Sequence, residues 1–121
     1  MYSSYEAEEA DSLLIKKSLR SGQRVKFCGN IIVQGDVNPG AEVIADGNVI
    51  VMGTLWGMVH AGAGGDKTAS IMAFQLRPTQ LRISDHFTRP PDGIEAKICF
   101  EPEIAFIREG RVVIEEYEAV K

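Results

Sequence analysis

Short apolar runs separated by glycines form the dominant pattern along the first half of the chain. Between residues 24 and 55 these runs are rich in Val and Ile and lack the spacing of a helix. Arg24-Val25-Lys26-Phe27 alternates polar and apolar positions, which predicts a half-buried strand with Val25 and Phe27 facing inward. The pattern therefore predicts short β-strands that are joined by tight corners.

One nine-residue segment nearly repeats itself 18 residues later. Gly29-Asn30-Ile31-Ile32-Val33-Gln34-Gly35-Asp36-Val37 returns as Gly47-Asn48-Val49-Ile50-Val51-Met52-Gly53-Thr54-Leu55, with five of the nine positions identical. Gly65 lies another 18 residues beyond Gly47, and we expect it to continue the same column of glycines. Repetition at a fixed period is typical of an architecture in which each unit buries its apolar face on the next one.

The 18-residue unit accommodates three strands with a corner after each, which is one turn of a three-sided β-helix. Successive coils lie about 4.8 Å apart, so each residue is expected to stack on the residue 18 positions later. The predicted fold class is therefore all-β, a three-sided β-helix with 18 residues per coil. The expected stacked pairs are Gly22 with Gly40, Val25 with Val43, Phe27 with Ala45, and Val33 with Val51.

Further strands are predicted beyond the repeat, although the period is interrupted at residues 62–68. A loop is expected at residues 85–93 because Pro90 and Pro91 lack the amide donor that a sheet requires. Arg108-Glu109-Gly110-Arg111 fits a hairpin turn, and this C-terminal hairpin is expected to cap the exposed end of the stack. The predicted strands are residues 70–76, 80–83, 94–100, 104–107 and 112–117.

Composition indicates one soluble domain with an acidic start. Residues 1–12 contain four acidic residues and no basic one, so the rest of the chain balances 13 cations against 13 anions. We expect residues 1–18 to form an acidic linker or arm and residues 19–121 to form the β-helix domain. A neutral folded part argues against nucleic acid as a partner. Without a long apolar run or a charged leader, the chain is expected to be cytoplasmic.

No constellation of residues indicates catalysis, a cofactor or a metal site. His60 and His86 are the only histidines, and neither has a Cys, Asp or Glu at a metal-binding spacing. The glycine-rich residues 62–68 lack the glycine that precedes the lysine of a phosphate-binding loop. Cys28 and Cys99 are expected to be buried free thiols rather than a disulfide. We therefore expect a protein that is not an enzyme.

Two other classes of protein share the expected architecture. Hexapeptide acyltransferases build similar coils, but they place an aliphatic residue before each small corner residue, where this chain has Cys28, Gln34, Asp46 and Met52. Bactofilin-like cytoskeletal proteins stack β-helices into filaments, and they are the main alternative. The fold alone does not choose between an enzyme, a filament and a binding module.

A dense and colinear set of motifs extends from residue 19 to about residue 117. It comprises Arg20-Ser21-Gly22-Gln23, Gly-Asp-Val-Asn-Pro-Gly-Ala-Glu-Val at residues 35–43, Ile-Ala-Asp-Gly-Asn at residues 44–48, and Ala61-Gly62-Ala63. These motifs resemble the carboxy-terminal domain of the MinC family of septum-site-determining proteins. The resemblance implies a right-handed β-helix that forms a homodimer and binds MinD, an ATP-dependent, membrane-associated ATPase. The amino-terminal domain of the family would precede residue 1.

The same resemblance implies a non-enzymatic regulator of cell division that needs no cofactor of its own. ATP-bound MinD would recruit it from the cytoplasm to the inner face of the membrane. Assembly of FtsZ would be inhibited there, mainly through the missing amino-terminal domain. The MinD-contacting motif of the family maps onto Arg20, Ser21, Gly22 and Gln23, which are unchanged in this chain.

Family members also carry a basic pair that engages FtsZ, at the position where this chain reads Trp56-Gly57-Met58. The basic contact is therefore not expected here. Exposed apolar side chains on a prism tend to form interfaces, so Trp56 and Met58 are expected on the dimer face.

Overall fold

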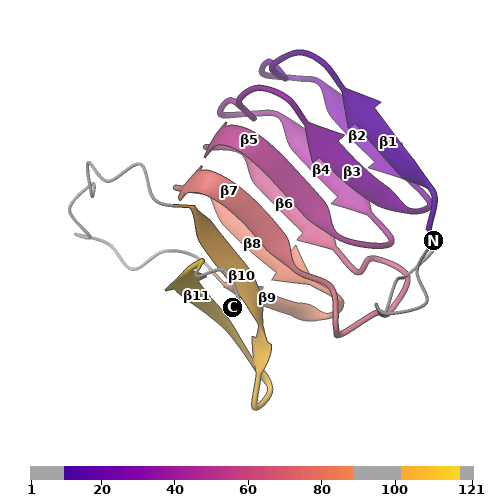
Figure 1. Ribbon diagram of the computed structural model, residues 1–121, viewed down its shortest axis with the longest axis vertical. Helices are drawn as coiled ribbons and strands as arrows, with labels where there is room; N and C mark the ends of the chain where they lie inside the picture. Colours follow the sequence, from indigo (N-terminus) through magenta and orange to yellow (C-terminus); the bar gives the residue numbers. More distant parts are fainter. Residues whose placement is uncertain (1–9, 89–101, 118–121) are drawn as a thin grey trace, which may run out of the picture.

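The computed structural model describes residues 10–88 and 102–117, which form eleven strands and no helix. Figure 1 shows these strands stacked in layers along the long axis of the molecule, with the last hairpin (yellow) at the far end from β1. The strands are Ser12–Ile15 (β1), Arg24–Phe27 (β2), Asn30–Val33 (β3), Glu42–Ala45 (β4), Val49–Leu55 (β5), Met58–Ala61 (β6), Ile71–Leu76 (β7), Gln80–Ile83 (β8), His86–Thr88 (β9), Glu103–Arg108 (β10) and Arg111–Glu116 (β11).

The chain winds between two sheets, so that consecutive strands alternate from one sheet to the other (Figure 1). One sheet has six strands in the order β1-β3-β5-β7-β10-β11, and the other has five in the order β2-β4-β6-β8-β9. The third side has no named strand of its own and is held by isolated parallel bridges from Leu19 to Val37 and from Val37 to Leu55. The prediction of an all-β, three-sided, right-handed β-helix is confirmed.

The predicted 18-residue register is confirmed for the first coils. Val25 pairs with Val43, and Val33 pairs with Val51. The period then changes, because Val43 pairs with Val59, two residues early, and Val49 pairs with Ile71, four residues late. The insertion at residues 62–68 accounts for the late pairing.

Gly65 does not continue the glycine column, contrary to the expectation. Its φ of 107° belongs to the inserted loop, whereas the backbone N–H of Ser70 bonds to the side chain of Asn48 at 2.8 Å. This bond places Ser70 in register with Asn48, and so the residue that follows Gly47 in the column is Ala69.

Side-chain hydrogen bonds join the corners of successive coils. The backbone N–H of Asn48 donates to Oδ1 of Asn30 at 2.8 Å, and the N–H of Ser70 donates in the same way to Asn48. At a second corner, the N–H of Asp36 donates to Oγ of Ser18 at 2.9 Å, and the N–H of Thr54 donates to Oδ1 of Asp36 at 2.8 Å. These ladders satisfy backbone amides that no strand partner reaches, which explains the polar residue after each glycine of the repeat.

The repeated glycines make room for these ladders. A Cβ atom at Gly47 would clash with Oδ1 of Asn30, and one at Gly53 would clash with Oδ1 of Asp36 and lie 2.7 Å from the carbonyl oxygen of Gly35. Neither glycine has a positive φ, so the requirement is close approach rather than backbone conformation.

The inward side chains form columns of Val, Ile and Leu that fill the prism. Ile31, Val49 and Ile71 stack in one column and are completely buried. The inward residues of the first coil are only half-buried, as Val25 and Phe27 show, because this coil lies at the end of the stack. Deeper coils therefore contribute most of the hydrophobic stabilisation.

Two expectations about the chain ends need correction and one is confirmed. Residues 12–15 form β1 and pair with β3, so the coil stack begins within the expected linker at residues 1–18. Residues 86–88 form β9, antiparallel to β8, where a loop was expected. The C-terminal hairpin is confirmed, since β10 pairs with both β7 and β11. Its two-residue loop has positive φ at Glu109 and Gly110, which suits the strand twist.

The two cysteines cannot both be placed. Cys28 is exposed rather than buried, and its thiol is free. Cys99 and the predicted strand at residues 94–100 lie outside the described residues.

Gly53→Ala should lower the free energy of unfolding by about 1–3 kcal/mol, because the added methyl group must displace backbone of the preceding coil. Urea unfolding followed by circular dichroism measures this change. Gly64→Ala is the matched control, since its nearest atom would lie at an ordinary contact distance of 3.5 Å. Equal unfolding midpoints for the two variants would show that the corner does not require glycine.

Candidate partner-binding surface

Arg20, Ser21, Gly22 and Gln23 form an exposed turn that leads into β2. The N–H of Gln23 donates to the carbonyl oxygen of Arg20 at 3.0 Å, and Gly22 has a φ of 86°. This combination is that of a type II turn, which requires glycine at its third position. The side-chain oxygen of Gln23 also accepts the N–H of Arg20 at 2.7 Å, so the turn is closed from both ends. We call these four residues the Arg20 turn.

The Arg20 turn is held against a matching turn of the next coil. In that turn the N–H of Ala41 donates to the carbonyl oxygen of Asn38 at 3.0 Å, and Gly40 has a φ of 85°. The N–H of Gly22 donates to the carbonyl oxygen of Gly40, also at 3.0 Å. Both turns are therefore fixed by backbone bonds, and the side chains of the Arg20 turn are presented on a rigid support.

Trp56 and Met58, the other predicted site residues, lie on different parts of the prism. Met58 is the first residue of β6, between Glu42 and Gln80 in the five-stranded sheet. Trp56 lies at the corner before β6, and the guanidinium carbon of Arg77 lies 5.5 Å from the centre of its indole ring. Each of the two side chains is 37% exposed.

A row of apolar side chains on the outer face of the six-stranded sheet was not predicted. Ile50 pairs with Ile32 on one side and with Met72 on the other, and all three point away from the core. The signal was present in the sequence, because apolar residues in unbroken succession place apolar groups on both faces of a strand. We call this set the apolar row: Leu14, Ile32, Ile50, Met72 and Ile104 in register, with Met52 and Phe74 beside them.

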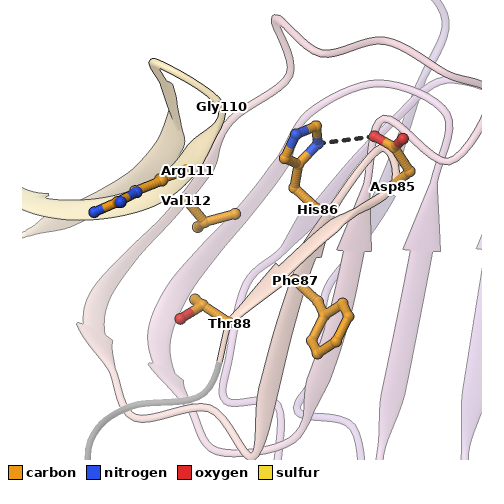
Figure 2. Close-up of a pocket in the computed structure, with 7 residues that line it drawn as sticks. All are labelled: Asp85, His86, Phe87, Thr88, Gly110, Arg111 and Val112. Atoms are coloured by element: carbon orange, nitrogen blue, oxygen red, sulfur yellow. Dashed lines mark ion pairs between the residues drawn. The ribbon is translucent and has the colours of Figure 1, made fainter.

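A pocket lies between the two terminal hairpins, and Figure 2 shows the residues that line it: Asp85, His86, Phe87, Thr88, Gly110, Arg111 and Val112. In this view His86 turns toward Asp85, whereas the guanidinium of Arg111 points away from both. Nδ1 of His86 lies 2.8 Å from Oδ1 of Asp85, although the geometry is not that of a hydrogen bond. A hydrogen bond from its own backbone lowers the pKa of Asp85, and the charges of His86 and Lys67 act in the same direction.

This pocket lacks the groups that hydrolytic or metal chemistry needs. No cluster of three His, Cys, Asp or Glu side chains occurs in the described part of the chain. His60, the other histidine, donates from Nε2 to the carbonyl oxygen of Ser84 at 2.8 Å. No helix within residues 10–88 and 102–117 could span a membrane. The notable surfaces of the prism are therefore the Arg20 turn and the apolar row.

The carboxy-terminal domain of the septum formation inhibitor MinC is the family model that matches this chain, over residues 13–117. The probable septum site-determining protein MinC of Heliobacterium modesticaldum is 57% identical over 106 residues, which are 88% of this chain and 36% of that protein. The protein of the same name from Acetivibrio thermocellus is 54% identical over 91% of this chain and 48% of its own length. This chain thus spans about a third to a half of the length of these relatives.

A solved structure, the MinC:MinD cell division protein complex of Aquifex aeolicus, contains a chain of the same fold. The two chains are 38% identical and superpose with a TM-score of 0.83, over 91% of this chain and 89% of the other. The family match begins at residue 13, within β1, which agrees with a coil stack that starts there. By both sequence and fold, this chain belongs to the MinC family, in which it corresponds to the carboxy-terminal domain.

Proposed function

We propose that this chain is a non-enzymatic binding module of a cell-division regulator, and that it binds ATP-bound MinD through the Arg20 turn. Two relatives carry the name of a septum site-determining protein, and a chain of the same fold was solved in a complex with MinD. The observation that carries the proposal is the rigid, fully exposed geometry of residues 20–23.

The chemistry of the turn suits a protein partner. The guanidinium of Arg20 can donate two parallel hydrogen bonds to a carboxylate or to neighbouring carbonyl oxygens. The hydroxyl group of Ser21 adds an adaptable polar contact, and Gly22 allows the partner backbone to approach closely. MinD would thereby recruit the protein from the cytoplasm to the inner face of the membrane, where FtsZ assembly is inhibited mainly through the amino-terminal domain of the family.

The homodimer forms, in this proposal, through the apolar row. Leu14, Ile50 and Phe74 are each more than a third exposed, and together they cover several strands of one flat sheet face. A continuous apolar face of this kind marks an interface rather than an ordinary surface. A symmetric dimer would carry two Arg20 turns, so that two membrane-bound MinD molecules bind it with avidity.

Arg20→Ala should weaken MinD binding by about 30-fold or more, because arginine hot spots contribute about 2 kcal/mol or more to an interface. Gly22→Asp should have a similar effect, since a side chain is strained at a φ of 86° and projects into the binding surface. The measurement is a titration with MinD in the presence of ATP and, separately, of ADP. Arg111→Ala, at the opposite end of the stack, is the control.

The circular dichroism of both turn variants should stay strand-rich, because a Cβ atom at Gly22 meets nothing within 4 Å. Undiminished MinD binding by a folded Arg20→Ala variant would sink the assignment of the turn.

Ile50→Glu should convert the dimer to monomers, because it places a carboxylate in the middle of the apolar row. Sedimentation velocity measures the change, and Lys26→Glu on the five-stranded sheet controls for the altered charge. If Trp56→Glu dissociates the dimer and Ile50→Glu does not, the dimer face lies at Trp56 and Met58 instead. Steadily growing light scattering from the unmodified chain alone would favour a bactofilin-like filament.

A further inference from the structure

The Arg20 turn shares a column of the coil stack with an exposed tryptophan. Parallel bridges join Leu19 to Val37 and Val37 to Leu55, and the register of β5 with β7 continues from Leu55 to Leu76. All four of these residues are buried. The residues that directly follow them therefore form a second column on the same edge of the prism: Arg20, Asn38, Trp56 and Arg77.

The spacing of this column follows from the coil repeat. Adjacent coils lie about 4.8 Å apart, so Arg20 and Trp56 are separated by about 10 Å along the stack. Asn38 lies between them, and its side-chain amide donates to the carbonyl oxygen of Leu19 at 2.9 Å. One partner surface could therefore contact both Arg20 and Trp56 without spanning a gap.

Trp56 is held in place although its side chain is partly exposed. Its N–H donates to the carbonyl oxygen of Val37 at 2.8 Å, and its own carbonyl oxygen accepts the hydroxyl group of Thr79 at 3.0 Å. Gly57 packs against the backbone of Ala41 with no room for a Cβ atom. The guanidinium of Arg77 lies over the indole ring, a contact that favours a fixed orientation. A rigid, partly exposed tryptophan beside an arginine is typical of an interface hot spot.

The apolar row does not account for this tryptophan. The row lies on the outer face of the six-stranded sheet, whereas Trp56 follows Leu55, which bridges to Val37 on the third side of the prism. A dimer formed by the row would thus leave the indole available to another protein.

We propose that Trp56, held by Arg77, is the second contact of the MinD-binding surface that begins at the Arg20 turn. This inference rests on the proposed function, and it specifies the chemistry of the partner. MinD would offer carboxylate or carbonyl oxygens to Arg20 and, about 10 Å further along, an apolar recess for the indole ring. The two contacts would orient the prism on MinD, because a single turn cannot fix its rotation.

Trp56→Ala in the full chain should lower the affinity for ATP-bound MinD at least tenfold, and Trp56→Phe should lower it less, because phenylalanine keeps part of the aromatic contact. Sedimentation velocity should show the same dimer for both variants. Phe87→Ala is the matched control, since Phe87 is a more exposed aromatic residue at the far end of the stack. Its affinity for MinD should equal that of the unmodified chain.

A second measurement keeps the test independent of how the variants fold. Trp56 is the only tryptophan, so a chain labelled with 5-fluorotryptophan gives a single ¹⁹F resonance. Unlabelled MinD with ATP should shift or broaden this resonance, and MinD with ADP should not.

The outcomes separate this inference from the proposed function. Wild-type affinity of Trp56→Ala, or an unmoved ¹⁹F resonance, together with lost binding by Arg20→Ala, overturns the role of Trp56 and leaves the Arg20 turn in place. Wild-type affinity of Arg20→Ala contradicts the proposed function itself. Monomeric Trp56→Glu would assign the indole to the dimer and overturn the inference.

Discussion

Hydrogen bonding between successive coils is the constraint on which the rest of this structure depends. Strand pairing alone covers two sides of the prism, and the third side has only single bridges. The corners therefore need side chains such as Asn30 and Asp36 to accept backbone N–H groups from the next coil. Because these acceptors lie directly against the next backbone, Gly47 and Gly53 must lack a Cβ atom. Register, corner chemistry and glycine spacing are thus one requirement.

Much of the fold could be predicted because this requirement is local in the sequence. The echo of Gly-Asn and of Gly-Asp or Gly-Thr repeats wherever two coils stack, and it fixed the pairing of Val33 with Val51 in advance. The third coil could not be predicted in the same way. Its corner before β6 is two residues shorter and the next corner is four residues longer, and each change alters the offset without altering the type of strand. β1 was missed because the acidic residues before it dominated the composition of the chain start.

The binding surfaces were predictable to different degrees. The Arg20 turn followed from a resemblance, whereas its conformation depends on backbone bonds to Gly40 that no local pattern reveals. The apolar row could have been read from Ile31-Ile32-Val33, since two of three neighbouring side chains cannot face the same core. The relation between Arg20 and Trp56 required the structure, because it depends on three inward leucine or valine positions being in register. Together these surfaces make the coil stack a device that spaces a dimer face and a partner column on separate sides.

The central claim is that one edge of the prism, from the Arg20 turn to Trp56, is the surface that meets MinD. Amide hydrogen exchange of the dimer, with and without MinD and ATP, tests it most directly. The account predicts slower exchange at residues 20–23 and 56–57, no change in the apolar row already covered in the dimer, and no effect of MinD with ADP. Slower exchange confined to the β10–β11 hairpin, or none along the edge, would contradict it.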